Sequence, residues 1–379
     1  GLGLPLLALA MAGYVLWLGQ LQAGSHQKSH YWFFLAPWSG WTSLRFLGLT
    51  AVFSVVLFWG GKRLPRWLPG LLTLLLLGSQ WVCAQTALRT LAGNIPWSFD
   101  HPSFMFRLKE FGDLFPRVIG VYTPWWNAGI EHYAGVTSGA HAYGMLLLPL
   151  LKIWDPHVFY GPALVFWYVF GFPWLGVAAA RAAGAKWSGA MCAGLLLCGV
   201  SRGPIFWMWH YGTAGAMTSA MMVAPVVALG YRLAVLGRGS WGTAAALGLC
   251  AWLMCLWTPG AVVAAGLFLG WLWNWKAWTW RANIRLLGAG ALALALWAPY
   301  LWAAAFPASY AAKYFSSATV RPGMTEMLAG GWNRLCIGFQ EWHPVVLWFG
   351  LIGTLLVAPR ELRRWMLPVF ILLAIPAGW

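Results

Sequence analysis

Acidic side chains are scarce in this chain, which has only 8 Asp and Glu among 379 residues. All charged residues together make up 8% of the sequence, against roughly 25% in a soluble domain. The hydrophobic fraction is 61%, and so little polar surface cannot cover so apolar a core in water. The composition therefore excludes an ordinary soluble protein and predicts an all-α, polytopic transmembrane helical bundle.

Several sequence signatures of known chemistry are also missing. The chain has no P-loop and no GxGxxG in a strand–helix context. Its six cysteines form no CxxC pair, so they predict packing rather than redox chemistry. The net charge is +16, but no compact Lys/Arg-rich domain exists to bind nucleic acid. The basic residues instead predict membrane orientation.

Long apolar runs are what the sequence has in abundance. They predict about 11 spanning helices, near 2–19, 41–60, 68–87, 158–180, 187–201, 215–235, 241–257, 261–275, 286–305, 345–358 and 365–379. The run at 142–151 is too short to cross and predicts an interfacial or re-entrant piece. The chain starts at Gly1 and stops at Trp379 inside an apolar run, so we expect residues 1–379 to be one membrane domain of a longer protein.

This arrangement places every short basic connection on the inner face, as the positive-inside rule requires. It also leaves two long outer loops, at 88–140 and 306–344. Residues 104–115 of the first loop mix Phe and Leu with charged residues, which predicts a short amphipathic helix in the interface. The Pro-Gly pair at 259–260 predicts a tight outer turn over Thr258–Gly260.

Four of the eight acidic residues fall in the first outer loop, and Asp100, in the triplet Asp100-His101-Pro102, is the leading candidate for chemistry. A partly desolvated carboxylate at a membrane surface can act as a general base or bind a divalent cation such as Mg²⁺ or Mn²⁺. The alternative is structural, because Asp is a favoured N-cap residue and Pro is favoured in the first turn of a helix.

Further candidates lie in other outer segments. Glu341 and His343 precede a predicted span and either complete an outer site or form a polar lead-in to that helix. Glu131 lies in the first loop and is a possible support for the same site. An outer arginine can grip a phosphate bidentately or bind a lipid headgroup, and we expect at least one of three to meet a substrate phosphate: Arg202, Arg321 and Arg334.

The order of segments resembles the GT-C superfamily of polytopic membrane glycosyltransferases. "SFDHPSFMFRLKEF" is similar to the acidic residue and interfacial helix of that family, and "PWWNAGIEHYAG" to its Trp/Gly stretch. The following segment, from His141 to the Ala180-Arg181-Ala182 triplet, resembles the short aromatic-rich segment and the helix after it. The resemblance covers residues 87–200, about a third of the chain.

The resemblance implies a sugar donor linked to a polyprenyl phosphate, in a bacterial inner membrane with the long loops on the outer, periplasmic side. Asp100, with His101 beside it, would then activate an acceptor hydroxyl or hold a metal, and an arginine would stabilise the departing phosphate. Two other classes stay open: a structural or accessory subunit of a larger membrane complex, and a lipid or polysaccharide transporter. The near absence of ionisable residues within the predicted spans weakens the transporter interpretation.

Overall fold

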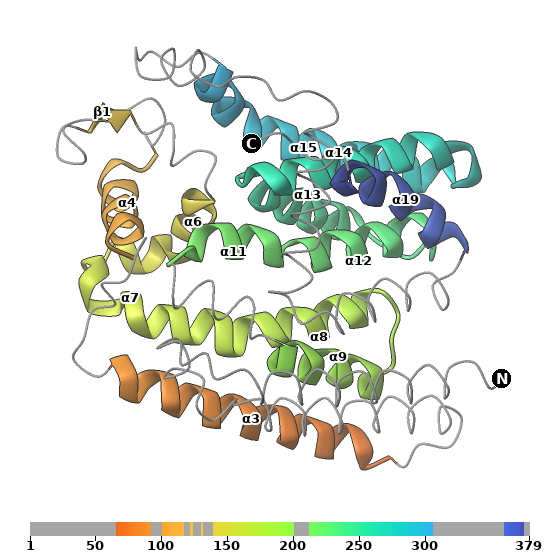
Figure 1. Ribbon diagram of the computed structural model, residues 1–379. Helices are drawn as coiled ribbons and strands as arrows, with labels where there is room; N and C mark the ends of the chain where they lie inside the picture. The colour runs from red at the N-terminus through yellow and green to blue at the C-terminus, as the bar shows by residue number, and fades with distance from the viewer. Residues whose placement is uncertain are drawn as a thin grey trace. The chain divides into compact units, whose positions relative to one another are not determined.

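A computed structural model describes residues 66–91, 101–116, 122–123, 130–131, 139–200, 212–305 and 360–374. These residues are mostly helical, which confirms the predicted helical class (Figure 1). They divide into two compact units. Unit 1 contains the described residues 66–91 and 160–200, and unit 2 contains the remainder.

Unit 1 is built on the helix α3 (Leu68–Leu91), which packs on α9 (Trp187–Val200). Leu68, Leu72 and Leu76 recur every four residues, so they share one face of α3 and are buried against Val177, Ala190, Met191 and Leu195. The opposite face exposes leucines, which is the pattern of a helix meeting lipid on one side and protein on the other.

A long helical segment supplies the rest of unit 1, except for its first residues, which belong to unit 2. It runs from α7 (Pro156–Val165) through the π-helix η2 (Phe166–Gly171) into α8 (Phe172–Ala182). Together these 27 residues are long and apolar enough to cross a membrane. α8 then turns back through Gly184, at φ +95°, to begin the antiparallel contact with α9.

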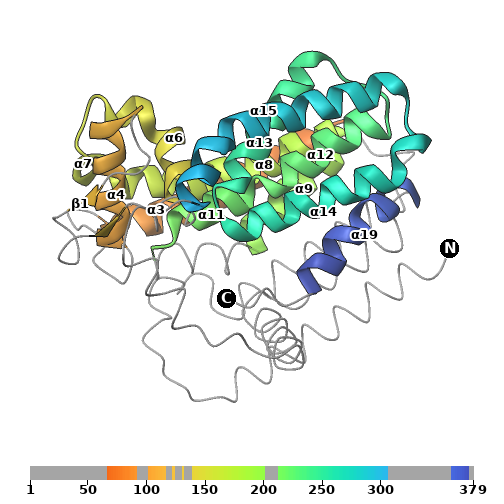
Figure 2. The ribbon, with the colours of Figure 1, turned by 90° about the horizontal axis from the view of Figure 1, so that it is seen from above.

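Unit 2 contains the other described elements. They are α4 (His101–Leu114), β1 (Tyr122–Thr123), β2 (Ile130–Glu131), α6 (Ala140–Leu151), α11 (Ala214–Met221), α12 (Val223–Ala234), α13 (Trp241–Cys255), α14 (Thr258–Asn274), the 3-10 helix η4 (Trp275–Ala277), α15 (Trp280–Ala305) and α19 (Arg360–Ala374). Figure 2 shows α13 beside α15 and α14 beside α19, two pairs in close contact.

Three helices among the described residues are long and apolar enough to span a bilayer: Pro156–Ala182, Ala214–Ala234 and Trp280–Leu301. They coincide with the spans predicted at 158–180, 215–235 and 286–305. Other predicted spans form helices in α3, α9, α13 and α14, while those at 2–19, 41–60 and 345–358 lie outside the described residues. The short run at 142–151 becomes α6, whose 12 residues extend about 18 Å and cannot cross ~30 Å of hydrocarbon.

Three local predictions need correction. The turn predicted over Thr258–Gly260 is wrong, because these residues form the first turn of α14, where proline is tolerated. The connection between α13 and α14 lies just before it, at Leu256 and Trp257. The helix at the last predicted span, α19, begins at Arg360 rather than at 365, and its basic residues are good helix formers. Finally, the all-α prediction missed a two-residue antiparallel pairing within residues 88–140, of Tyr122 with Glu131 and of Thr123 with Ile130.

Candidate functional site

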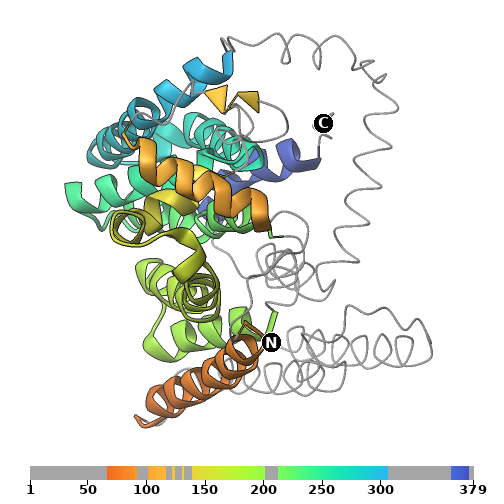
Figure 3. The same cartoon turned by 90° about the vertical axis from the view of Figure 1, so that its left-hand side faces the viewer.

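The predicted amphipathic helix after Asp100 exists as α4, and its packing defines the candidate site in unit 2 (Figure 3). Phe104, Leu108 and Phe111 are buried at spacings of four and three residues, so they form one stripe facing α6. His101 is also fully buried, at the first residue of the helix. The prediction of an amphipathic helix is therefore confirmed.

Two glycines allow α4 and α6 to approach closely. A Cβ at Gly144 of α6 would lie 2.9 Å from Cδ1 of Phe111, and a Cβ at Gly112 of α4 would lie 3.1 Å from Cβ of Leu151. Any larger side chain at Gly144 would displace the Phe111 ring. Glycine at this position thus sets the distance between the two helices.

The rings of Phe111, His141 and Tyr300 form a buried row that joins α4, α6 and α15. The Phe111 and His141 centroids are 5.4 Å apart, and those of His141 and Tyr300 are 5.5 Å apart. All three side chains are at most 4% exposed. Aromatic contacts of this kind fix ring orientation, so the row holds an imidazole in a set position within an apolar core. Nothing in the sequence alone distinguished His141 from the other histidines.

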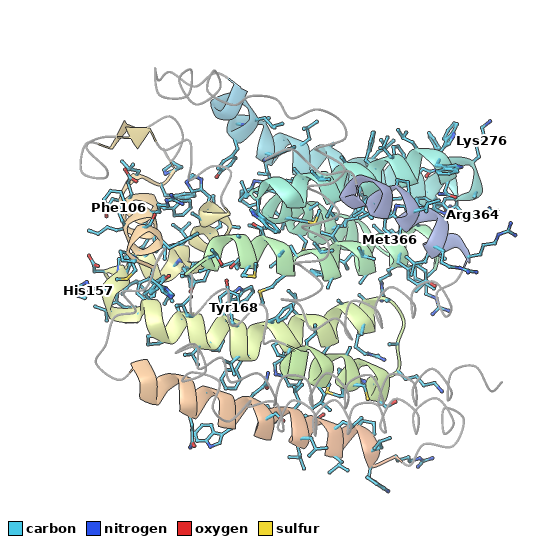
Figure 4. The ribbon with its side chains drawn as sticks, in the orientation of Figure 1. Phe106, His157, Tyr168, Lys276, Arg364 and Met366 are labelled. Atoms are coloured by element: carbon cyan, nitrogen blue, oxygen red, sulfur yellow. The ribbon has the colours of Figure 1, made fainter. Side chains whose placement is uncertain are left out.

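Charged side chains tie the exposed face of α4 to the turn between α6 and α7. Figure 4 labels Phe106 of α4 and His157 of α7 in this region. Lys109 Nζ lies 3.3 Å from Asp113 Oδ2 and 3.4 Å from Asp155 Oδ2. Asp155 Oδ1 is 2.6 Å from His157 Nδ1, and Lys152 Nζ donates to the carbonyl of Gly112 at 2.6 Å. These contacts bring two of the eight acidic residues together on the solvated side of the helix.

The electrostatics of this cluster favour its charged forms. The hydrogen bond and the charge of Asp113 raise the pKa of Lys109 above its usual 10.5, and Asp155 adds to the effect. Partial burial raises the pKa of Asp155, but hydrogen bonds from His157 and Lys109 outweigh it, so this pKa lies below its usual 3.8. Asp155 is therefore ionised at neutral pH and is suited to binding cations rather than to accepting protons.

Backbone contacts between two helix starts form another part of unit 2. Gly139, at φ +77°, precedes α6, and any Cβ there would meet the carbonyl of Gly215 in α11. A Cβ at Gly215 would in turn meet the backbone of Ala140. The Gly139 N–H donates to the Leu256 carbonyl at 2.9 Å, so the start of α6 is also fixed to the turn before α14. This junction places His141 two residues from a rigid backbone contact.

Unit 1 contains a buried polar contact that no sequence pattern indicated. Gln80 of α3 is fully buried and donates from Nε2 to the Val169 carbonyl at 3.0 Å. Its Oε1 accepts from Nε1 of Trp174 at 3.2 Å. Because η2 is a π-helix, its carbonyls depart from the regular i→i+4 pattern, and the Gln80 amide supplies a donor at that break. A search of the spans for ionisable groups passes over amides such as this one.

Most predicted site residues lie outside the described residues: Asp100, Arg202, Arg321, Arg334, Glu341 and His343. Of the others, His101 begins α4, and Glu131 lies in β2 opposite Tyr122. Their predicted roles stay predictions. Within the described part of the chain, no three His, Cys, Asp or Glu side chains gather closely enough to hold a metal ion. That finding does not test the cation predicted at Asp100.

Comparison with known protein families, with curated proteins and with solved structures gave no match to this chain. The resemblance to the GT-C superfamily therefore stays a hypothesis about residues 87–200. What the structure adds is an amphipathic helix on a short apolar helix, with acidic residues gathered on its solvated side.

Proposed function

We propose that this chain is an integral membrane glycosyltransferase that moves a sugar from a polyprenyl-phosphate donor to an acceptor hydroxyl at the outer face of a bacterial inner membrane. The observation that supports this most is the gathering of carboxylates along α4. Asp113 and Asp155 meet at Lys109, Glu110 lies on the same helix, and Asp100 directly precedes it in the sequence. Transfer between a lipid-linked donor and a water-soluble acceptor needs polar groups at such a boundary.

The proposed reaction uses residues near the start of α4. Asp100 takes the proton of the acceptor hydroxyl while the acceptor oxygen attacks the anomeric carbon. Alternatively, Asp100 would hold a Mg²⁺ or Mn²⁺ ion that acidifies the hydroxyl, whose proton would then pass to water. The bond from the anomeric carbon to the phosphate oxygen breaks, and the phosphate leaves with its negative charge. One of Arg202, Arg321 and Arg334 stabilises that charge. His101, buried at the first position of α4, would hold this end of the helix in place.

The proposal includes an architecture. About 11 spans form one membrane domain, of which three described helices have the required length and composition. The loops at 88–140 and 306–344 lie on the outer face, with α4 and α6 at the interface. Glu131, Glu341 and His343 then support the outer site from these loops.

Substitution Asp100→Asn tests the catalytic assignment. It removes the base but keeps the size of the side chain and its ability to cap a helix. We expect transfer from a polyprenyl-phosphate sugar to fall on the order of 10²-fold to 10⁴-fold in kcat, measured in membranes containing the full chain.

The matched control is Asp113→Asn, a carboxylate on the solvated face of the same region with 63% of its side chain exposed. This variant should retain transferase activity within about twofold. Asp113 takes no part in the proposed step, and loss of a surface ion pair changes stability little. Full activity of Asp100→Asn would remove this residue from the mechanism. A chain that folds and inserts but transfers no sugar from any polyprenyl-phosphate donor would contradict the proposed function itself.

A non-catalytic subunit of a larger membrane complex is the second candidate. One surface of α3 and the residue before it favours this candidate, because it exposes a set of large apolar side chains: Trp67, Leu71, Leu74, Leu75, Leu77 and Trp81. Lipid covers such a surface in a monomer, and a neighbouring helix covers it in a complex. Co-purification with a stable partner in the absence of transferase activity would favour this second candidate.

A further inference from the structure

One end of unit 2 gathers basic side chains from four helices around a buried tryptophan. Trp365 of α19 is 4% exposed, and its Nε1 donates to the Leu267 carbonyl of α14 at 3.0 Å. Its ring meets the ring of Trp278 edge-on, with centroids 5.8 Å apart. A Cβ at Gly230 of α12 would collide with the same ring, so α12 also reaches it.

Trp365, Gly230 and Trp278 each lie close to a basic residue in the sequence. Arg364 precedes Trp365, Arg232 follows Gly230 by two residues, and Lys276 and Arg281 flank Trp278. The full set, which we call the basic end, contains eight side chains, six of them exposed: Arg232, Arg238, Lys276, Arg281, Arg285, Arg360, Arg363 and Arg364. Figure 4 shows Lys276 and Arg364 at this end of the unit, away from Phe106 and His157.

The turn that carries Lys276 is fixed in place. Asn283 accepts from Nε1 of Trp271 at 2.9 Å and donates to the Trp275 carbonyl at 2.8 Å. Asn283 is 5% exposed, so a buried side chain holds the connection between α14 and α15 in place through these hydrogen bonds. A fixed turn lowers the entropy lost when its basic side chains bind a ligand.

Acidic residues are nearly absent from this part of the chain. The sequence contains no Asp or Glu between Asp155 and Glu326, and Glu361 is the only one within α19. The basic end therefore carries a large excess of positive charge. Its natural ligand is an anion, and the guanidinium group binds phosphate oxygens in pairs.

Exposed indole rings lie at the same end. Trp241 is the first residue of α13, and Trp280 is the first residue of α15. Trp273 lies in the last turn of α14, and Trp275 follows that helix. All four side chains are at least 48% exposed. A Cβ at Gly288 of α15 would lie 2.8 Å from the Trp241 ring, so the start of α13 lies close against α15. Exposed tryptophan beside apolar helices is typical of the headgroup level of a bilayer. This argues for a lipid phosphate rather than a soluble anion.

We propose that the basic end is a binding surface for anionic phospholipid headgroups, with phosphates held by basic residues from α12, α15, α19 and the turn after α14. This proposal does not depend on sugar transfer, because it concerns the end of unit 2 away from α4. Basic residues grouped beside spanning helices bind acidic headgroups, with each residue strengthening the attraction.

The test uses the full chain purified in detergent. Short-chain phosphatidylglycerol is titrated in, with phosphatidylcholine and inorganic phosphate as separate probes. Bound lipids are counted by native mass spectrometry, and the melting temperature is recorded. We expect phosphatidylglycerol to bind and to raise the melting temperature, while the other two probes do neither.

Two double variants with matched charge and exposure make the test specific. Lys276→Gln with Arg364→Gln should weaken phosphatidylglycerol binding by about tenfold or more. Arg66→Gln with Lys186→Gln removes two exposed basic residues of unit 1. This variant should bind phosphatidylglycerol within about twofold of the unaltered chain. The charge-preserving pair Lys276→Arg with Arg364→Lys should bind as the unaltered chain does and shows that these positions tolerate change.

Three results would overturn the proposal. Equal loss in the two glutamine variants would show a general charge effect rather than a built surface. Equal binding of the zwitterionic phosphatidylcholine would show that the net negative charge of the headgroup is not recognised. Stabilisation by inorganic phosphate alone, as large as that by phosphatidylglycerol, would assign the basic end to a soluble anion.

Discussion

Single glycines decide how closely the helices of unit 2 approach. A Cβ at Gly144 would press on the Phe111 ring, whereas a Cβ at Gly290, also inside a helix, would have no neighbouring atom within 4 Å. The same substitution at these two positions therefore separates packing from helix propensity. The comparison needs no assumption about the function of the chain.

We expect Gly144→Ala to lower the free energy of unfolding by about 1–3 kcal/mol, because the added carbon forces the Phe111 ring and its neighbour His141 to move. Gly290→Ala should instead stabilise the chain by about 0.5–1 kcal/mol, through the better helix propensity of alanine. Thermal unfolding in detergent measures both. Similar shifts for the two variants would show that the contact between α4 and α6 is looser than described.

Gln80 and His141 show what the sequence could not predict at this scale. A glutamine in an apolar run carries no signal about which carbonyl it will meet, and the break in hydrogen bonding at η2 depends on the whole helix. The burial of His141 likewise follows from the rings of Phe111 and Tyr300, which are distant in sequence. The candidate residues chosen for their charge were identifiable, but their surroundings were not.

At the scale of elements, the contact between α4 and the turn after α6 depends on ionised side chains. The folded pKa of Asp155 lies below its usual 3.8, so its contribution to stability is fully present above that value. That contribution is lost as the pH falls through the folded pKa. Lys109 has the opposite pH dependence. Its pKa is raised in the folded chain, so its contribution to stability is present below pH 10.5 and is lost only as the pH rises through the folded pKa.

We therefore expect unfolding to become easier for the unaltered chain as the pH is lowered from about 5 to about 3, and less so for Asp155→Asn. Hydrogen exchange of α4 follows this locally, without requiring global unfolding. The effect should be small, because the Lys109, Asp155 and His157 side chains are between 37% and 59% exposed. Identical pH profiles for the two proteins would show that Asp155 does not hold α4 in place.

Element boundaries show where sequence patterns succeed and where they fail. The spans at 158–180, 215–235 and 286–305 were predictable because apolar length is a property of the run itself. Thr258–Gly260 was misassigned because Pro-Gly favours both a turn and the first turn of a helix. A Cβ at Gly260 would collide with the Met254 carbonyl, and this close approach of α14 to the end of α13 exists only in the folded chain.

At the scale of the molecule, unit 2 carries its charges unevenly from end to end. The acidic residues of α4 and of the turn after α6 lie in the region of Phe106 and His157, far from Lys276 and Arg364 of the basic end (Figure 4), where α19 contributes only Glu361. From the positive-inside rule we predict that the basic end lies at the inner face and the long first loop on the outer side. This assignment makes the two ends of unit 2 accessible from opposite sides of the membrane.

Labelling of single cysteines tests this assignment. We expect Asp113→Cys to react with a membrane-impermeant maleimide added from outside and Lys276→Cys to react only after the membrane is permeabilised. Both side chains are exposed, so access rather than burial controls the reaction. The unaltered chain, with its own six cysteines, supplies the background. Labelling of both variants from the same side would contradict the topology and, with it, the outer position of Asp100.

The uneven distribution of charge in unit 2 has a further consequence once the chain resides in an energised membrane. Moving one elementary charge through a potential of 100 mV changes the free energy by about 2.3 kcal/mol. If the orientation of the chain were inverted, the six exposed cations at the basic end would all have to cross the membrane against that potential. With the basic end on the inner face, as the positive-inside rule predicts, a potential that is negative inside would reinforce this orientation, and loss of the potential would remove the reinforcement without altering a single contact.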